Sequence, residues 1–216
     1  MELRDALRGS GAARTFTSDT VDDATLFAIL DDARFAPSGG NRQPWRVAIV
    51  RELTLRRELA DHMRTVWYEY VGARGGDDAP FSFGRRTEAA PVAAPHPLLD
   101  HIDTVPVVLV VAADLRRIAM MDGNLDRPTI TGGASVYPFC WSILLAARER
   151  GLGGVITTFL SRAEPAVAPT LGLPEGHALV ATIFLGRPEH QNTKLRRDEV
   201  SEFTTNDRFD GEAFHG

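Results

Sequence analysis

Apolar side chains recur every three to four residues in three stretches of the chain, and this period predicts helices. The first helix is expected from about Val21 to Phe35, with Thr20 as its N-cap, and the second over residues 55–70. The third, from about Ser135 to Arg150, is apolar on nearly every side, and Gly151 is expected to end it. A helix of that kind is buried and can also pack against a second subunit.

Shorter runs of apolar and β-branched residues predict strands, at residues 45–50, 106–113, 155–159 and 178–185. The second and fourth runs are apolar almost throughout, which is typical of strands buried on both faces. The pattern Ser161-Arg162-Ala163-Glu164 fits a capping box and predicts a helix that closes near Gly172. Residues 114–133 fit neither period. The pattern therefore predicts an α+β protein with helices around a small sheet.

Two stretches lack any regular apolar period. Residues 72–104 contain Gly75-Gly76 and four prolines, and loops of this length inside a domain are often lids or binding segments, so we expect a long lid-like excursion. Residues 188–216 form a polar tail. With no internal repeat along residues 1–216, we expect one domain of ordinary size.

Charge and composition exclude several functions. The chain has 216 residues, 24 basic and 29 acidic, and 24 − 29 gives the net charge of −5, which argues against a general nucleic-acid binder. Of the basic residues only Lys194 is a lysine, and its neighbours Thr193 and Leu195 exclude a P-loop. A single cysteine, Cys140, excludes an intramolecular disulfide, and its apolar surroundings favour a buried structural thiol. No apolar run approaches the ~20 residues that span a bilayer. We expect a cytoplasmic protein without nucleic-acid or membrane partners.

Three segments carry groups suited to binding. The loop Ala36-Pro37-Ser38-Gly39-Gly40-Asn41-Arg42-Gln43-Pro44-Trp45 offers close backbone approach and amide groups, although ordinary turn residues explain its composition equally well. Lys194-Leu195-Arg196-Arg197 suits a phosphate, or is a solvated basic cluster. Arg14 precedes the first predicted helix. His96 and His101 lack metal-ligand partners at the required spacing, so we expect both at the surface.

The order of these motifs is more specific than any one of them. The chain resembles the nitroreductase-like family of FMN-dependent oxidoreductases through Arg14-Thr15-Phe16, Ala36 to Trp45, Leu144 to Gly153, Leu185-Gly186-Arg187-Pro188 and Lys194 to Arg197. The resemblance covers nearly the whole chain and is weakest over residues 72–124.

The resemblance implies a fold, an assembly and a cofactor site. The fold would be α+β, with a small central mixed sheet flanked by helices, in a homodimer whose C-terminal arms (residues 188–216) are exchanged and whose two FMN sites lie at the interface. Arg14 would contact the flavin or its phosphate, and Lys194 and Arg196 would hold the phosphate. The cofactor would be lined by Pro37, Ser38, Gly39 and Asn41, with Asn41 from the partner's side, and approached at its ring by Gly153 and Gly154.

The implied activity is hydride transfer from NADH or NADPH through flavin N5 to an electron-poor acceptor such as a nitroaromatic or a quinone. The protein would supply binding and electrostatics, and no side-chain acid or base is assigned. Two positions depart from the family pattern: Gly11-Ala12 stands where a basic and a hydroxyl residue are common, and Cys140-Trp141 where a polar pair is common. A flavin-binding or sequestering protein with little turnover is therefore the alternative. A reductive dehalogenase or flavin-fragmenting enzyme is a third possibility.

Overall fold

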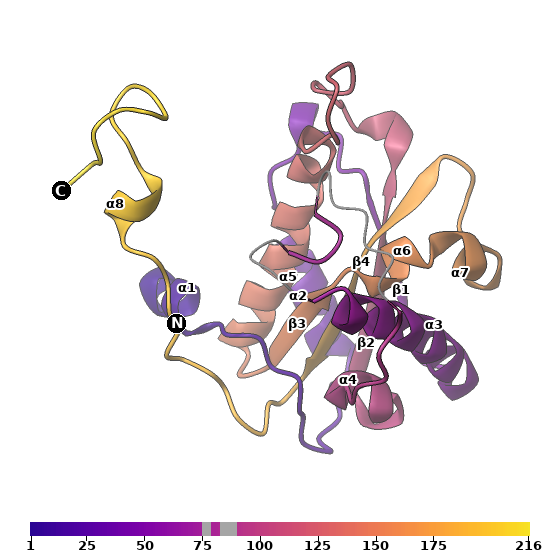
Figure 1. The fold of residues 1–216 in the computed structure, drawn as a ribbon. Helices are drawn as coiled ribbons and strands as arrows, with labels where there is room; N and C mark the ends of the chain where they lie inside the picture. The colour runs from indigo at the N-terminus through magenta and orange to yellow at the C-terminus, as the bar shows by residue number, and fades with distance from the viewer. Residues whose placement is uncertain (75–78, 83–89) are drawn as a thin grey trace.

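A four-stranded sheet with helices on both faces forms the body of the protein, described by a computed structural model over residues 1–74, 79–82 and 90–216 (Figure 1). The sheet order is β1-β2-β4-β3, with the strands β1 (Trp45–Ile49), β2 (Val107–Asp114), β3 (Gly153–Thr157) and β4 (His177–Gly186). Every pairing in this sheet is antiparallel, so the mixed sheet implied by the resemblance is wrong for the described part of the chain. The connection from β1 to β2 brings the chain back to the end of the sheet where β1 finished, so Ile49, the last residue of β1, pairs with Leu109 near the start of β2.

Each face of the sheet is covered by its own group of helices, which bury two separate apolar clusters. The helices are α1 (Leu3–Gly9), α2 (Asp23–Ala33), α3 (Leu53–Gly72), α4 (Pro97–Asp100), α5 (Tyr137–Glu149), α6 (Phe159–Arg162), α7 (Glu164–Leu171) and α8 (Val200–Phe203). Helices α2 and α5 cover one face, and α3, α4, α6 and α7 cover the other. None of the helices in the described ranges is long and apolar enough to cross a membrane.

Alternation along β2 explains why this strand is apolar at nearly every position. Leu109 and Val111 face the α2–α5 cluster, whereas Val108 and Val110 face the α3 cluster, because successive side chains of a strand point to opposite faces. All eight residues of the strand are buried, as predicted. Cys140 on α5 is also buried, as predicted, and burial raises the pKa of its thiol to about 12.

Local hydrogen bonds correct two predicted helix starts. The N-cap of α2 is Asp22, not Thr20: its carboxylate accepts from the backbone N–H of Thr25 at 2.6 Å. The capping box is wrong as well. Ser161 lies inside α6 and donates to the carbonyl of Val180, while Glu164 accepts from the N–H of Leu179. Both side chains bind the backbone of β4 instead of each other's backbone N–H groups, and the segment divides into α6 and α7.

Residues 114–133, which fitted no period, are ordered around the buried carboxylate of Asp122. It accepts hydrogen bonds from Thr131 Oγ1, from the N–H of Ile130 and from Arg127. These bonds, the Thr131 hydroxyl first, hold the pKa of Asp122 well below its usual range. The loop ends in a short 3-10 turn, Thr131–Ser135, which leads into α5.

The two ends of the chain run side by side before the C-terminal residues leave the body. The N–H of Thr17 donates to the carbonyl of Arg187 at 2.9 Å, and the N–H of Gly11 donates to the carbonyl of Asn192 at 3.1 Å. Beyond this ribbon the chain continues through α8 into a segment that stands apart from the sheet (Figure 1). The lid-like excursion predicted at residues 72–104 falls partly outside the described residues, at 75–78 and 83–89.

Candidate functional site

A cavity of about 570 Å³ opens between the C-terminal end of α3 and the end of β3. Aromatic rings form much of its wall. Trp67 and Tyr70 stack with centroids 5.8 Å apart, and His96 lies edge-on to Trp67 at 4.9 Å. Phe159 closes the same group, 6.0 Å from Trp67. Flat faces of this kind suit a planar ligand.

The charged groups of the cavity are cations. Arg14 and Arg74 line it, and no carboxylate does so among the residues that the structure describes. A second hollow of about 300 Å³ shares Arg14 and Pro97 with the first, so Arg14 stands where the two meet. The second hollow also has a carboxylate in its lining, Glu189, so only the larger cavity presents cations without an opposing carboxylate among its described lining residues.

Two buried polar atoms in the cavity wall have no hydrogen-bond partner: Thr157 Oγ1 and His96 Nδ1. Buried polar groups are normally satisfied, so both atoms mark a place where a ligand or water completes the structure. His96 is only 7% exposed, and the prediction that it lies at the surface is wrong; His101 is exposed, as predicted. Burial, and then the charge of Arg14, lower the pKa of His96.

Gly153 and Gly154 allow close packing within the chain. A Cβ on Gly154 would lie 2.4 Å from the carbonyl oxygen of Phe184, and one on Gly153 would lie 2.7 Å from Gln191 Oε1. Both glycines are buried, and the cavity is lined instead by the residues that follow, Ile156–Phe159. Sequence reasoning missed the stretch Ile156–Phe159, for which two hydroxyl residues and an aromatic at the end of a predicted strand were the available signal. For Trp67 and Tyr70 the sequence leaves open an aromatic lid over a flat substrate or core packing, and the structure places both in the cavity wall.

The loop of residues 36–43 is held in an unusual backbone conformation. Gly40, Asn41 and Gln43 have φ angles of 60°, 52° and 47°, in the left-handed region that costs energy for residues other than glycine. Ser38 and Ser135 fix the loop: Ser38 Oγ accepts from the N–H of Gln43, and Ser135 Oγ accepts from the N–H of Gly39, both at 3.0 Å. Such maintained strain is a feature of binding sites.

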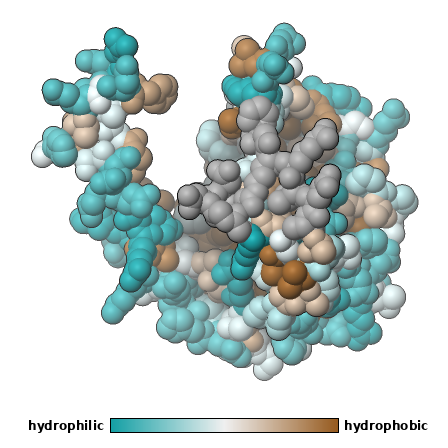
Figure 2. All heavy atoms as spheres, in the orientation of Figure 1, coloured by the Kyte–Doolittle hydropathy of each residue, from teal (hydrophilic) through white to brown (hydrophobic). Residues whose placement is uncertain are grey.

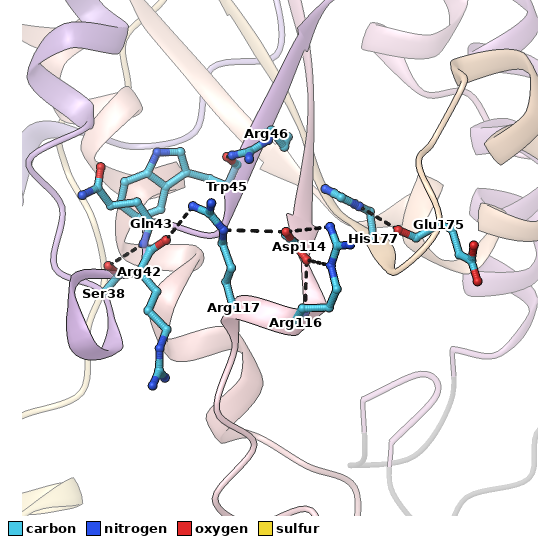
Figure 3. A network of polar contacts seen from close by, with 10 residues as sticks. All are labelled: Ser38, Arg42, Gln43, Trp45, Arg46, Asp114, Arg116, Arg117, Glu175 and His177. Atoms are coloured by element: carbon cyan, nitrogen blue, oxygen red, sulfur yellow. Dashed lines mark hydrogen bonds and ion pairs between the residues drawn. The ribbon is translucent and has the colours of Figure 1, made fainter.

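An ionic network at the end of β2 lies beside this loop and contacts it (Figure 3). Asp114 is buried and accepts two hydrogen bonds from the Arg116 guanidinium, which hold the pKa of Asp114 at about 2. Arg117 lies 3.7 Å from the same carboxylate and donates to the carbonyl of Arg42 at 3.2 Å. Asp114 therefore anchors the arginine that holds the loop.

Lys194 and Arg196 are exposed on the ribbon formed by the chain ends. Gly11 packs so closely on this ribbon that a Cβ there would lie 2.4 Å from the carbonyl oxygen of Asn192. No larger residue fits at position 11 in this arrangement, which accounts for Gly11 but not for the exposed Ala12 beside it. Lys194 lies two residues beyond Asn192, on the stretch that leads to α8.

The family model for the Nitroreductase family matches residues 10–187. The chain belongs to the nitroreductase family. It is 27% identical to nitrobenzene nitroreductase of Ectopseudomonas oleovorans, over 94% of this chain and 96% of that protein. It is 30% identical to 5,6-dimethylbenzimidazole synthase of Rhodospirillum rubrum, over 85% of this chain and 82% of that protein. The structure of NADPH:FMN oxidoreductase from Vibrio harveyi, complexed with NAD⁺, superposes with a TM-score of 0.68 at 20% identity, over 95% of this chain and 77% of that one.

The predicted nitroreductase-like α+β fold is thus confirmed, and the family identifies the chain as an oxidoreductase. No group of three or more histidine, cysteine, aspartate or glutamate side chains suited to a metal ion occurs within the described part of this member of the nitroreductase family.

This nitroreductase fold brings only some of the predicted site residues together. Arg14 lies beside β3, because the N–H of Ala13 donates to the carbonyl of Gly154 at 3.0 Å. The loop with Pro37, Ser38, Gly39 and Asn41 leads into β1 instead. Strands β1 and β3 are the two outer strands, roughly 14 Å apart at the usual spacing. The loop also packs on the α2–α5 face, whereas the cavity lies on the α3 face.

Proposed function

We propose that the protein is an FMN-dependent oxidoreductase that uses NADH or NADPH to reduce an electron-poor acceptor such as a nitroaromatic or a quinone. The observation that carries the proposal is the cavity at Arg14, in a chain of the nitroreductase family. The Arg14 guanidinium and two unpartnered buried polar atoms suit the polar, anionic edge of a cofactor such as FMN, and the aromatic wall leaves a flat face for an acceptor.

Bound FMN would supply the redox chemistry by accepting a hydride at N5 and passing it to the acceptor. Arg14 would stabilise negative charge on the flavin, and Thr157 and His96 would offer hydrogen bonds to its polar edge. Lys194 and Arg196 would hold the phosphate, as a point charge and a guanidinium fork respectively. The end of β3 and the residues that follow it, Ile156–Phe159, would approach the flavin ring, and Gly153 and Gly154 would position that strand by packing closely on neighbouring segments of the same chain. Since NADH and NADPH are cytoplasmic donors, we place the enzyme in the cytoplasm.

The proposed enzyme is a homodimer, because one chain does not complete the site. The loop with Pro37, Ser38, Gly39 and Asn41 cannot reach the Arg14 cavity of its own chain across the sheet, so it would line the cavity of a second copy. Large apolar side chains are exposed on α2, just beyond its C-cap and on the C-terminal arm, and they support such a contact: Phe27, Phe35, Phe203 and Phe209. Figure 2 shows apolar residues scattered on the arm, and we propose that the arm is exchanged with the partner.

An absorbance spectrum of the pure protein, followed by anaerobic titration with NADH and then NADPH, tests the proposal. We expect a yellow protein that one of the two donors bleaches and that an added nitroaromatic or quinone restores. A colourless protein that takes up no added FMN would contradict the proposal.

The phosphate site has its own test. Replacing Lys194 and Arg196 together with alanine removes two charged contacts, and we expect FMN affinity to fall at least 100-fold in fluorescence titration. Arg208→Ala is the matched control, because Arg208 lies in the same tail but pairs with Asp210 at 3.1 Å. Unchanged affinity in the double variant would show that the phosphate binds elsewhere.

Gly11 supports a second candidate function, a flavin-binding or sequestering protein with little turnover. The tight contact of Gly11 with Asn192 leaves no room there for an additional phosphate ligand. A yellow protein that neither NADH nor NADPH reduces with any acceptor would favour this function over the oxidoreductase.

A further inference from the structure

The C-terminal end of α3 holds a guanidinium over an aromatic pair at the cavity wall. Trp67 and Tyr70 lie three residues apart on one side of α3. Arg74 follows the C-cap residue Ala73 and lines the same cavity. The Arg74 Cζ atom lies 5.2 Å from the ring centroids of both Trp67 and Tyr70. Trp67 is itself fixed, because its Nε1 donates to the carbonyl of Ala94 at 3.0 Å. The charge of Arg74 is therefore oriented by aromatic contacts.

Arg74 also differs from the other arginines around it. On the adjacent surface Arg162 pairs with Glu69 at 2.8 Å, and Arg64 lies 3.7 Å from Asp100. Within the described part of the chain, neither Arg74 nor Arg14 forms an ion pair. The cavity thus presents two guanidinium groups without a carboxylate among its described lining residues.

The two arginines have different positions in the site. Arg14 lines both hollows and stands at their junction, whereas Arg74 lines only the larger one. If Arg14 serves the flavin, as in the proposed function, Arg74 remains as a second cation beside the aromatic wall. A guanidinium in such a place binds a carboxylate or similar anion through two parallel hydrogen bonds.

We propose that Arg74 selects aromatic acceptors that carry an acidic substituent, with the acceptor ring against the wall of Trp67 and Tyr70 and the acid group on the guanidinium. The inference rests on the proposed function, because that function assigns the Arg14 end of the cavity to the flavin.

The test compares two probes of similar size that differ in charge, 4-nitrobenzoate and 4-nitrobenzamide. Binding to the purified protein is measured by calorimetry without NAD(P)H, and kcat/KM is measured separately with the better donor. We expect the wild type to bind 4-nitrobenzoate about tenfold more tightly. Arg74→Gln weakens 4-nitrobenzoate binding by about 10- to 100-fold and leaves the amide within twofold, while Arg74→Lys recovers part of the loss. Arg162→Gln is the matched control, since it removes the same charge from the adjacent surface and changes neither probe.

Several outcomes overturn the inference. Equal affinity of the wild-type protein for both probes contradicts the inference without any variant. This comparison therefore tests the inference even if Arg74→Gln fails to fold. An equal loss of both probes in Arg74→Gln shows that Arg74 supports the wall and does not select charge. If the binding preference is found but no donor reduces either probe, the proposed function fails while the assignment of Arg74 stands.

Discussion

The ring of His96 lies edge-on to Trp67 and Phe159, where a charged imidazolium would be poorly solvated. Burial lowers the pKa of His96, the charge of Arg14 lowers it further, and Asp100 opposes both. The folded protein therefore binds fewer protons at this site than the unfolded chain, where histidine has its ordinary pKa of about 6.5. The contribution of His96 to the free energy of unfolding is therefore fully present above about pH 6.5 and is lost as the pH falls below that value.

We expect the free energy of unfolding to fall between pH 7.5 and pH 5.5, and His96→Gln to make that fall shallower. Urea unfolding at the two pH values measures the difference. His101→Gln is the control, because His101 is exposed five residues away and should leave the pH dependence unchanged. Equal pH dependence in wild type and His96→Gln would contradict the expectation.

The error over His96 shows a limit of sequence reasoning about single residues. His96 lies in a proline-rich segment without a period, and the helix and strand end that bury it are far away in the sequence. The residues next to His96 in the sequence do not indicate such a contact. Cys140 was predicted correctly because its burial follows from neighbours on its own helix.

At the scale of elements, periodic segments were predicted well and short ones were not. Strand β2 and helix α5 bury long apolar faces, and this pattern is visible along the chain. Helices α1, α4 and α8 have seven residues or fewer, and helices of that length depend on tertiary contacts more than on their own sequence. The predicted capping box failed for the same reason, since its side chains bind β4.

Strand β3 offers a test of close packing between elements. A methyl group on Gly154 would meet the backbone of β4 as well as a side chain of α5, and backbone cannot move aside cheaply. We expect Gly154→Ala to lower the free energy of unfolding by about 1–3 kcal/mol in urea denaturation.

Gly132→Ala is the matched control, because a Cβ at Gly132 makes only ordinary contacts, the nearest at 3.7 Å. Its effect should stay within about 0.5 kcal/mol. Equal stability of the two variants would mean that β3 and β4 separate easily.

At the scale of the whole molecule, the C-terminal arm has no core of its own. Phe203 is 70% exposed and Phe209 is fully exposed, although both are among the most apolar side chains of the arm. The sequence predicts a tail without a regular apolar period, but no sequence pattern indicates whether the tail covers its own chain or a second copy. The same holds for the loop of residues 36–43, which the proposed function assigns to the cavity of a second copy.

We expect removal of residues 199–216 to convert a dimer into a folded monomer, because the deleted residues stand apart from the sheet. Light scattering after size-exclusion chromatography measures the mass, and circular dichroism reports the fold. Lys194 and Arg196 are retained, so a loss of FMN in the monomer would reflect the missing partner loop. A truncated chain that stays dimeric would show that the arm is not the main contact.

The ribbon that joins the chain ends has a consequence for biosynthesis. Gln191 Nε2 donates to the carbonyl of Gly11, 180 residues earlier in the chain. At about 5–20 residues per second, a ribosome needs roughly 9–36 s between these two points. The central strand β4, which pairs with both β2 and β3, is also made late. The segment that carries Arg14 is therefore made long before the residues on which it docks, and a nascent chain cannot complete this ribbon until residues 187–192 have been synthesised.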